Sequence, residues 1–437
     1  MAMMDRPRVA IVGGGISGLT AAIGLQDVVE TVLFEAAPEV GGHILPVAVS
    51  DPRGAPAAVD TGFVVFVPET YPEFTAMLGW LGVAHGPATT PFRITDDSRE
   101  LSFPAADILK LCGDAIPQAC RRDLYRLYQS LLRIRKEGLD WIDNVPLQAW
   151  MDAQGFDPAT AQLGVLPWIA SFWGIQPETV CGVSARVALR EIARNAGPAG
   201  MHRVHPSTRA YLDGLTQQVR NVRHTKVSAV NVEGTPSVEV DGGLETFDHV
   251  VVAVDAIDAR GLIRGACTDL GAVLGAFEYE PTAAVVHRDA SLLPADRSKW
   301  CTFHHRRRVD QDRMRSVTTW VFDLLHEWTP DPNAIEAPVL MTIGDRGILD
   351  SGIIAQDTVV AEFRHRHLVS TPAVVEALQA LPTLDADQPF SLAGSYLGLG
   401  GLHEDAVQSG MRAASRTRQR LGLDAPRWPW KSKPSGR

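Results

Sequence analysis

The stretch RVAIVGGGISGLTAAIGL, residues 8–25, decides the fold of this chain. Its apolar run, Val9 to Val12, is typical of a buried strand, and the alanine-rich segment after the glycines is typical of a helix. Between them, Gly13, Gly15 and Gly18 follow the pattern G-x-G-x-x-G. This pattern predicts a strand, a tight turn and a helix whose free N–H groups attract the phosphates of a dinucleotide.

The glycines of this turn indicate a backbone that has to come close to a ligand. Gly13 permits the turn, Gly15 lets the backbone approach a pyrophosphate, and Gly18 permits close packing of the helix on the strand. We expect the turn to bind the dinucleotide through Gly13, Gly14, Gly15, Ile16, Ser17 and Gly18.

An acidic residue, Glu35, directly follows the next apolar stretch, residues 31–34. A dinucleotide-binding unit needs an acid at this place. Glu35 follows Gly15 by about twenty residues, the usual spacing for a carboxylate that binds a ribose hydroxyl. An acid at this place disfavours a 2′-phosphate and therefore NADP. NAD and FAD both fit this part of the sequence.

The composition is that of an ordinary globular protein with room for two subdomains. The chain has 437 residues, of which 45% are hydrophobic and 21% charged, and its formal net charge is -10. Because single cores stop growing near about 250 to 300 residues, we expect a cofactor domain and a substrate domain. The negative charge disfavours nucleic acid as a partner. The basic run from His304 to Arg308 is interpreted as solvated surface.

The cysteines and the N-terminal apolar run bear on the compartment of the protein. The cysteine count is odd and no C-x-x-C spacing occurs, so we expect reduced thiols without structural zinc. The run from Val9 to Val12 is too short for a leader or a membrane span. We therefore expect a cytoplasmic protein with no integral membrane segment. No G-x-S-x-G motif occurs, which leaves acyl hydrolysis without support.

Three further segments resemble those of a known family. Gly41-Gly42-His43 follows Glu35, VDTGFVVF occupies residues 59–66, and residues 401–410 lead into an alanine-containing helix. These segments resemble the FAD-dependent superfamily of amine oxidases and phytoene desaturases. Residues 59–66 resemble in particular a bacterial branch of predicted NAD/FAD-binding, amine-oxidase-like proteins. The resemblance implies non-covalent FAD, with His43 in a place where that family more often has arginine.

The resemblance also implies cofactor contacts along the whole chain. It places residues 59–66 near the isoalloxazine and the strand at residues 225–230 near the adenine. It directs the positive end of a C-terminal helix at the flavin, where this end would stabilise the negative charge that forms on reduction. The residues assigned to FAD on this basis are Gly41, Gly42, His43, Gly62, Phe63, Val227, Gly394, Ser395, Glu404, Asp405, Ala406 and Val407.

The fold implied by the resemblance is α/β, with a discontinuous Rossmann-like FAD-binding domain and an inserted α+β substrate domain. Patterns of apolar residues favour strands at residues 225–230 and 247–253 in the cofactor sheet, helices within residues 105–195 and antiparallel strands within residues 275–345. The last segment is expected either to dock on the surface or to fray. The expected bounds are 1–66, 205–270 and 390–423 for the FAD-binding domain, 67–204 and 271–389 for the substrate domain, and 424–437 for the tail.

Two departures from the family pattern weaken an assignment to amine oxidation. Leu402 stands where monoamine oxidases have a tyrosine of their aromatic cage, and Tyr396 stands where an acid is expected. His403 is our candidate base, since a neutral imidazole titrates at about pH 7 and can take a proton beside the flavin. A purely structural role for His403 fits equally well.

The predicted function is that of an FAD-dependent oxidoreductase, an oxidase, dehydrogenase or desaturase, that takes a hydride from a largely apolar small molecule or lipid. A non-redox flavin isomerase and a non-catalytic flavin-binding protein stay open as alternatives, and so does the electron acceptor, O2 or another. No metal is expected, because His304-His305 and His365-x-His367 lack a third ligand at metal spacing. Both histidine pairs are interpreted as surface residues.

Overall fold

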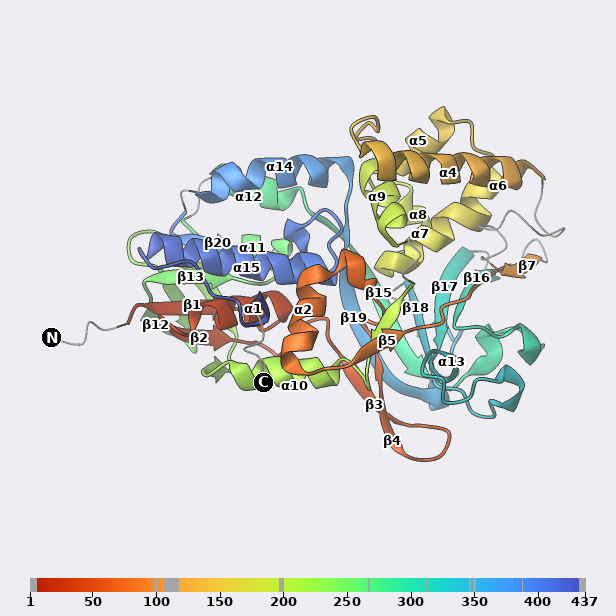
Figure 1. Ribbon diagram of the computed structural model, residues 1–437, viewed down its shortest axis with the longest axis horizontal. Helices are drawn as coiled ribbons and strands as arrows, with labels where there is room; N and C mark the ends of the chain where they lie inside the picture. Colours follow the sequence, from red (N-terminus) through yellow and green to blue (C-terminus); the bar gives the residue numbers. More distant parts are fainter. Residues whose placement is uncertain are drawn as a thin grey trace.

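The structure is a computed structural model, and it has two lobes that meet along one side (Figure 1). One lobe contains a parallel sheet between layers of helices, and the other contains a large, mostly antiparallel sheet under a layer of helices. The structure describes residues 6–97, 101–104, 118–195, 200–265, 268–310, 313–345, 347–348, 351–386 and 388–431.

A five-stranded parallel sheet forms the centre of the first lobe, with the strand order β20-β13-β1-β2-β9. Strand β1 is central because its residues after Arg8 are all apolar and fully buried, as a strand covered on both faces requires. The strands are β1 (Arg8–Val12), β2 (Glu30–Phe34), β9 (Val222–Arg223), β13 (His249–Val252) and β20 (Phe390–Leu392).

Helices cover both faces of this sheet. Helix α1 is buried along its whole length and packs against α15, where a side chain on Gly410 would meet the Ser17 carbonyl oxygen at 2.3 Å. One face carries α1 (Ile16–Leu25), α2 (Pro72–Leu81), α10 (Arg209–Gln218) and α15 (His403–Arg420). The other face carries α11 (Ala256–Leu262), α12 (Thr268–Gly275) and α14 (Pro372–Ala386).

The strand expected at residues 225–230 forms, but it lies outside the parallel sheet. It is β10 (Val227–Asn231), which belongs to a separate four-stranded sheet. The other strands there are β11 (Ser237–Val240), β12 (Gly243–Thr246) and β14 (Ile263–Arg264). The prediction that this segment completes the cofactor sheet was wrong, because its antiparallel hairpin partner β11 follows directly in the chain.

The second lobe contains a seven-stranded sheet with the order β19-β15-β18-β17-β16-β6-β7. Its pairs are antiparallel except for β16 with β6. The strands are β6 (Phe92–Asp96), β7 (Leu101–Pro104), β15 (Glu278–His287), β16 (Phe303–Asp310), β17 (Arg313–Val321), β18 (Leu340–Asp345) and β19 (Val359–Val369). Strands β6, β7 and β19 lie outside the range expected for strands.

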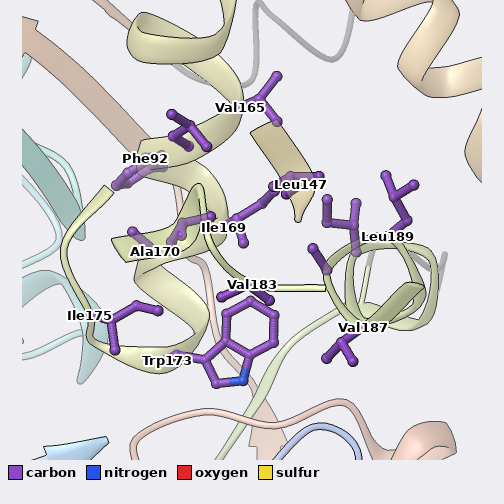
Figure 2. Packing of buried hydrophobic residues seen from close by; sticks show 14 of the residues in the cluster. Phe92, Leu147, Val165, Ile169, Ala170, Trp173, Ile175, Val183, Val187 and Leu189 are labelled. Atoms are coloured by element: carbon purple, nitrogen blue, oxygen red, sulfur yellow. The ribbon is translucent and has the colours of Figure 1, made fainter. Parts of the chain in front are cut away.

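Helices of the second lobe pack on one another and on this sheet through a single apolar cluster (Figure 2). In the close-up, Trp173 and Ile169 of one helix face Val183 and Leu147 of neighbouring segments. The helices are α4 (Gln118–Glu137), α5 (Leu147–Ala153), α6 (Pro158–Thr160), α7 (Leu166–Trp173), α8 (Pro177–Val180), α9 (Ala185–Asn195) and α13 (Phe322–Leu325). Two small two-stranded sheets lie beside the junction of the lobes: a hairpin of β3 (Pro46–Ser50) with β4 (Pro56–Asp60), and β5 (His85–Pro87) with the distant β8 (His202–Val204).

The basic run at His304 to Arg308 is part of β16 and not a solvated surface segment. His304 and His305 are 3% and 1% exposed, and because successive side chains of a strand point to opposite faces, both faces of β16 are covered there. The surface prediction for these two histidines was therefore wrong.

The last described residues dock on the first lobe. Trp428 packs over Gly24 of α1, where a side chain would meet the indole at 2.5 Å. Trp430 Nε1 donates a hydrogen bond to Glu73 of α2, and Lys431 pairs with the same carboxylate at 2.6 Å. Of the two outcomes expected for the tail, docking holds through Lys431, and residues 432–437 lie outside the described residues.

None of the helices within the described ranges is long and apolar enough to cross a membrane.

Candidate functional site

A cavity of about 1200 Å³ lies where the two lobes meet. The first lobe contributes the glycine turn after β1, the end of β2, the start of β10 and the segment after β13. The second lobe contributes α7 and one end of β16 to β19. Since single ligand pockets usually measure about 300 to 1,000 Å³, this cavity has room for more than one ligand.

The glycine turn is built so that backbone faces the cavity at Gly15. A side chain on Gly13 would meet the Ala253 carbonyl oxygen at 2.4 Å, and one on Gly18 would meet the Gly13 carbonyl oxygen at 2.0 Å. Gly15 is different, because the nearest atom to a side chain added there would be Gly42 Cα, at 3.9 Å. Gly13 and Gly18 therefore hold the turn closed, and Gly15 leaves open space at the start of α1 for a phosphate.

Glu35 lies at the end of β2 and lines the cavity beside this turn. Its two carboxylate oxygens each accept one backbone hydrogen bond, from Gly14 and Ala37, both at 2.8 Å. A carboxylate offers about four acceptor positions, so Glu35 keeps capacity for a ribose hydroxyl.

The segment from Gly41 to His43 crosses over residue 62 and closes one side of the cavity. Gly41 and Gly42 have positive φ values of 139° and 59°, which favour glycine. A side chain on Gly62 would meet the His43 carbonyl oxygen at 1.9 Å, so the D-T-G-F segment has to pass beneath this loop without one. His43 itself is exposed to the cavity.

Most of the residues assigned to FAD from the sequence are brought together in this cavity. The residues that line it are Gly13, Gly14, Gly15, Ile16, Ser17, Glu35, Gly41, Gly42, His43, Gly62, Phe63, Val227, Gly394, Ser395, His403 and Ala406. They come from parts of the chain that lie far apart in the sequence, between residues 13 and 406.

Four assigned residues do not line the cavity, and each has another structural role. Gly18 serves packing of α1. Glu404 accepts hydrogen bonds from the backbone N–H groups of Glu73 and Phe74 at 3.1 and 3.0 Å, and so caps the start of α2. Asp405 accepts from the Leu402 backbone at 3.0 Å, inside its own helix cap.

Burial raises the pKa of both Glu404 and Asp405. Val407, the fourth assigned residue, is fully buried in the apolar cluster of the first lobe. In this structure the side chains of Glu404, Asp405 and Val407 contact the protein itself and do not line the cavity.

His403 lines the cavity at the start of α15, but its imidazole is held by neighbours. Its ring stacks on Phe63 with a centroid distance of 3.9 Å, and its Nε2 lies 3.2 Å from the Tyr211 hydroxyl. Burial, with a smaller effect of His43, lowers the pKa of His403 to about 3. The expectation that it titrates at about pH 7 was wrong, because the ring is enclosed by apolar side chains.

A cluster of three histidines on the cavity wall was not predicted as part of the site. His365 and His367 of β19 lie beside His43, with ring centroids 5.0 and 5.9 Å from it. His365 is 5% exposed and His367 is partly buried, so the surface interpretation was wrong for His365. Both histidines line the cavity, together with Arg366 and Leu368 of the same strand.

Burial lowers the pKa of His365 to about 3 and that of His367 well below its ordinary value. Both imidazoles are therefore neutral near pH 7. Within the described part of the chain, no group of three or more His, Cys, Asp or Glu side chains could hold a metal ion.

The part of the cavity wall contributed by the second lobe is apolar and rich in aromatic rings. Its side chains are Phe92, Trp168, Phe172, Trp173, Phe303, Trp320, Met341 and Ile343. Several of them also belong to the core of that lobe, as expected for the aromatic run at residues 168–173. The two lobes thus give the cavity two chemically different ends, one lined by backbone and polar groups and one by aromatic side chains.

The fold and the geometry define a dinucleotide-binding protein with an apolar chamber beside the nucleotide site. A family model described as an NAD(P)-binding Rossmann-like domain matches residues 11–81, which include the glycine turn and Glu35. A comparison with curated protein sequences finds no match.

Solved structures share this fold over nearly the whole chain. Cyclohexylamine oxidase from Brevibacterium oxydans IH-35A has a TM-score of 0.67 at 14% identity, covering 95% of this chain and 100% of that one. A CLA-producing fatty acid isomerase from P. acnes has a TM-score of 0.67 at 12% identity, covering 94% and 98%. Reduced UDP-galactopyranose mutase has a TM-score of 0.64 at 14% identity, covering 97% of each chain.

The chain therefore has the fold that these proteins share. The α/β fold with a Rossmann-like dinucleotide-binding domain, expected from the resemblance to amine-oxidase-like flavoproteins, is confirmed. Because these neighbours include an oxidase, an isomerase and a mutase, the fold alone leaves the reaction open.

Proposed function

We propose that this protein binds FAD non-covalently and oxidises an uncharged, largely apolar small molecule by hydride transfer to the flavin. The observation that carries the proposal is the single cavity that joins the glycine turn of the first lobe to the aromatic wall of the second. Bound FAD would supply the hydride acceptor, N5 of its isoalloxazine.

The residues of the first lobe fit the nucleotide part of FAD. The open face of Gly15 and the N–H groups at the start of α1 suit a pyrophosphate, and Glu35 suits a ribose hydroxyl. His43, Gly41 and Ala406 line the same cavity, and we propose that they contact the rest of the cofactor.

The residues of the second lobe fit a substrate that reacts away from water. Aromatic walls exclude solvent, and a dry site keeps the reacting carbon and the hydride acceptor together. Some substrates lose a proton together with the hydride. For these we propose His403 as the base, because its imidazole is unprotonated near pH 7. The space beside the nucleotide end favours an enzyme over a non-catalytic flavin-binding protein.

A non-redox isomerase is the second candidate function. It is favoured by the shared fold with the fatty acid isomerase and the mutase. The two candidates differ in mass balance: oxidation removes two hydrogens from the substrate, and isomerisation leaves its mass unchanged.

The first experiment is the visible absorption spectrum of the purified protein, followed by heat denaturation and chromatography of the supernatant. Released FAD, with no colour left on the polypeptide, is the expected result. A colourless protein that also fails to bind added FAD would contradict the proposal.

Substrate screening follows from that result. Anaerobic bleaching of the flavin by a candidate substrate supports oxidation, and mass spectrometry of the product separates oxidation from isomerisation. Reoxidation by O2 or by an artificial acceptor then identifies which acceptor the enzyme uses.

A further inference from the structure

The segment that leads into α15 lies at the junction of the two lobes. It consists of residues 398–402, Gly-Leu-Gly-Gly-Leu, and its last two residues line the cavity, as do His403 and Ala406 of the helix itself. Whatever fixes this segment therefore also fixes the start of α15, which is the part of the helix that faces the cavity.

The glycines of this segment allow close contact with both lobes. A side chain on Gly400 would meet Asp405 Oδ2 at 3.1 Å and the Glu191 carboxylate of α9 at 3.2 Å. A side chain on Gly401 would meet Leu368 of β19 at 2.9 Å. The segment therefore lies against its own helix and against α9 and β19 of the second lobe.

Two side chains of the second lobe bind consecutive carbonyl groups of the segment. Ser370 Oγ donates to the Leu399 carbonyl oxygen at 3.1 Å, and Trp173 Nε1 donates to the Gly400 carbonyl oxygen at 2.7 Å. The bond from Trp173 is the shorter one, and Gly400 is buried. Because a buried carbonyl group without a donor is costly, the indole holds Gly400 in place.

Trp173 belongs to the core of the second lobe and reaches the first. It is the last residue of α7, is 7% exposed and packs in the apolar cluster that joins the helices of that lobe. In Figure 2 its indole nitrogen lies on the side of the ring turned away from the other labelled residues. This nitrogen donates to Gly400, so the bond connects the core of one lobe to the segment before α15 in the other.

Resting on the proposed function, we propose that Trp173 is a positioning residue for the cofactor, with Ser370 as a weaker second donor. Its hydrogen bond to Gly400 holds the start of α15 at the cavity where FAD binds. The first residues of this 18-residue helix carry the positive end of its dipole, which stabilises the negative charge that a flavin gains on reduction. Loss of the bond lets this helix end move, and it thereby weakens both FAD binding and the stabilisation of the reduced flavin.

The test removes the donor and keeps an aromatic ring. Trp173→Phe should make bound FAD dissociate about three- to tenfold faster on dilution, the effect of one net hydrogen bond, as measured by the fluorescence of free FAD. It should also lower the midpoint potential of the bound flavin, measured against a reference dye. Loss of the whole helix-end interaction is a change of about fivefold, which is about 20 mV for a two-electron couple, so the potential should fall by up to that amount.

Hydrogen exchange supplies a measurement that does not depend on FAD. Residues 398–407 should exchange faster in Trp173→Phe than in the unaltered protein, because the segment has lost one of its two donors from the second lobe.

Trp300→Phe is the matched control. Trp300 is 6% exposed and its Nε1 donates to the Pro294 carbonyl oxygen, also at 2.7 Å, but the residue is outside the cavity lining. Both variants lose an indole donor and some stability against urea. Only Trp173→Phe should change FAD dissociation, the flavin potential and the exchange of residues 398–407.

A second variant covers the case that Trp173→Phe does not fold. Ser370→Ala releases the neighbouring Leu399 carbonyl oxygen and leaves Trp173 in place. The same three quantities should change in the same direction by smaller amounts, and no change in any of them would contradict the inference.

Other outcomes would overturn the inference as well. They are unchanged FAD dissociation and potential in Trp173→Phe, equal changes in Trp300→Phe, or faster exchange of residues 398–407 with FAD binding and potential unaltered, which is a merely structural role. The FAD-release experiment separates the two proposals. A colourless protein whose residues 398–407 exchange faster in Trp173→Phe contradicts only the proposed function, and a yellow protein in which Trp173→Phe changes nothing contradicts only this inference.

Discussion

The two ends of the cavity recognise their ligands with different parts of the polypeptide. At the nucleotide end the turn offers backbone N–H groups, and the glycines of residues 13–18 keep side chains out of the way. At the substrate end the backbone is already paired in β16 to β19, so aromatic rings and imidazoles form the surface. The difference shows why one cofactor site can stay constant while substrates vary: backbone geometry serves every dinucleotide, and side chains set the substrate.

The largest expected effect is at the nucleotide end. We predict that Gly15→Val abolishes FAD retention, because its side chain would occupy the space beside Gly42 that a pyrophosphate needs. Gly15 has φ of -69°, a value that valine adopts, so the fold should remain. The measurement is FAD released per protein molecule, with the far-UV circular dichroism spectrum as a check of folding.

Two variants serve as controls for this prediction. Gly79→Val changes a glycine of α2 with open space around it and should leave FAD in place. Gly18→Ala should instead destabilise the protein by about 1–3 kcal/mol, because its new side chain clashes with the Gly13 carbonyl. Full FAD occupancy in Gly15→Val would show that the pyrophosphate is not bound here.

The second prediction concerns acid stability, and it separates the lobes. Burial lowers the pKa of several histidines of the second lobe from 6.5 to about 3 or 4; these are His287, His304, His305, His326 and His365. The unfolded chain binds protons at these groups near pH 6.5 and the folded protein does not, so the free energy of unfolding falls as the pH drops below that value.

Hydrogen exchange followed at about pH 5 and about pH 7 checks this prediction. Protection should be lost first in β15 to β19, since the second lobe holds more of these histidines, although His249 of β13 also has its pKa lowered by burial to about 3. If the parallel sheet lost its protection from hydrogen exchange before the antiparallel sheet, the prediction would be wrong.

A smaller effect is expected where α2 meets α15. Glu404→Ala removes the acceptor for two backbone N–H groups of α2, and we predict a loss of about 1–3 kcal/mol in the free energy of unfolding with FAD binding kept. Urea unfolding measures the first quantity and the absorption spectrum the second. A stable Glu404→Ala protein without FAD would instead restore Glu404 as a cofactor ligand.

The smallest effect is expected for His403. We predict that His403→Ala retains FAD and slows flavin reduction by less than about tenfold, since a base with a pKa of about 3 gives less help than one matched to neutral pH. Stopped-flow reduction by an identified substrate measures the rate. Unchanged kinetics would leave His403 with only its contacts to Phe63 and Tyr211.

The nucleotide end could be predicted from the sequence because its determinants are local. The turn at Gly13 to Gly18 and the acid Glu35 lie within one strand–helix–strand unit, and each glycine has a steric reason that a motif records. Glu404 and Asp405 do not line the cavity, because two acids at a helix start serve capping as readily as ligand binding; their assignment to FAD stays a prediction.

The substrate end could not be predicted in the same way, because distant strands form it. His43 and His365 meet only where the loop after Gly42 lies against β19, which no local pattern specifies. A weak signal does exist in residues 363–367, F-R-H-R-H, where aromatic rings alternate with arginines as on a strand with one covered face. Interpreting the two histidines as surface residues concealed that alternation.

The order of strands in the parallel sheet also has a consequence for synthesis on the ribosome. Strand β1 is central, yet its partner β13 and the neighbour β20 are encoded late, and Trp428 closes over α1 later still. At about 5–20 residues per second, the roughly 400 residues that follow α1 take roughly 20 to 80 seconds to emerge. Throughout that interval the apolar faces of β1 and α1 lack their final partners, so the first segment to be translated is among the last to be buried.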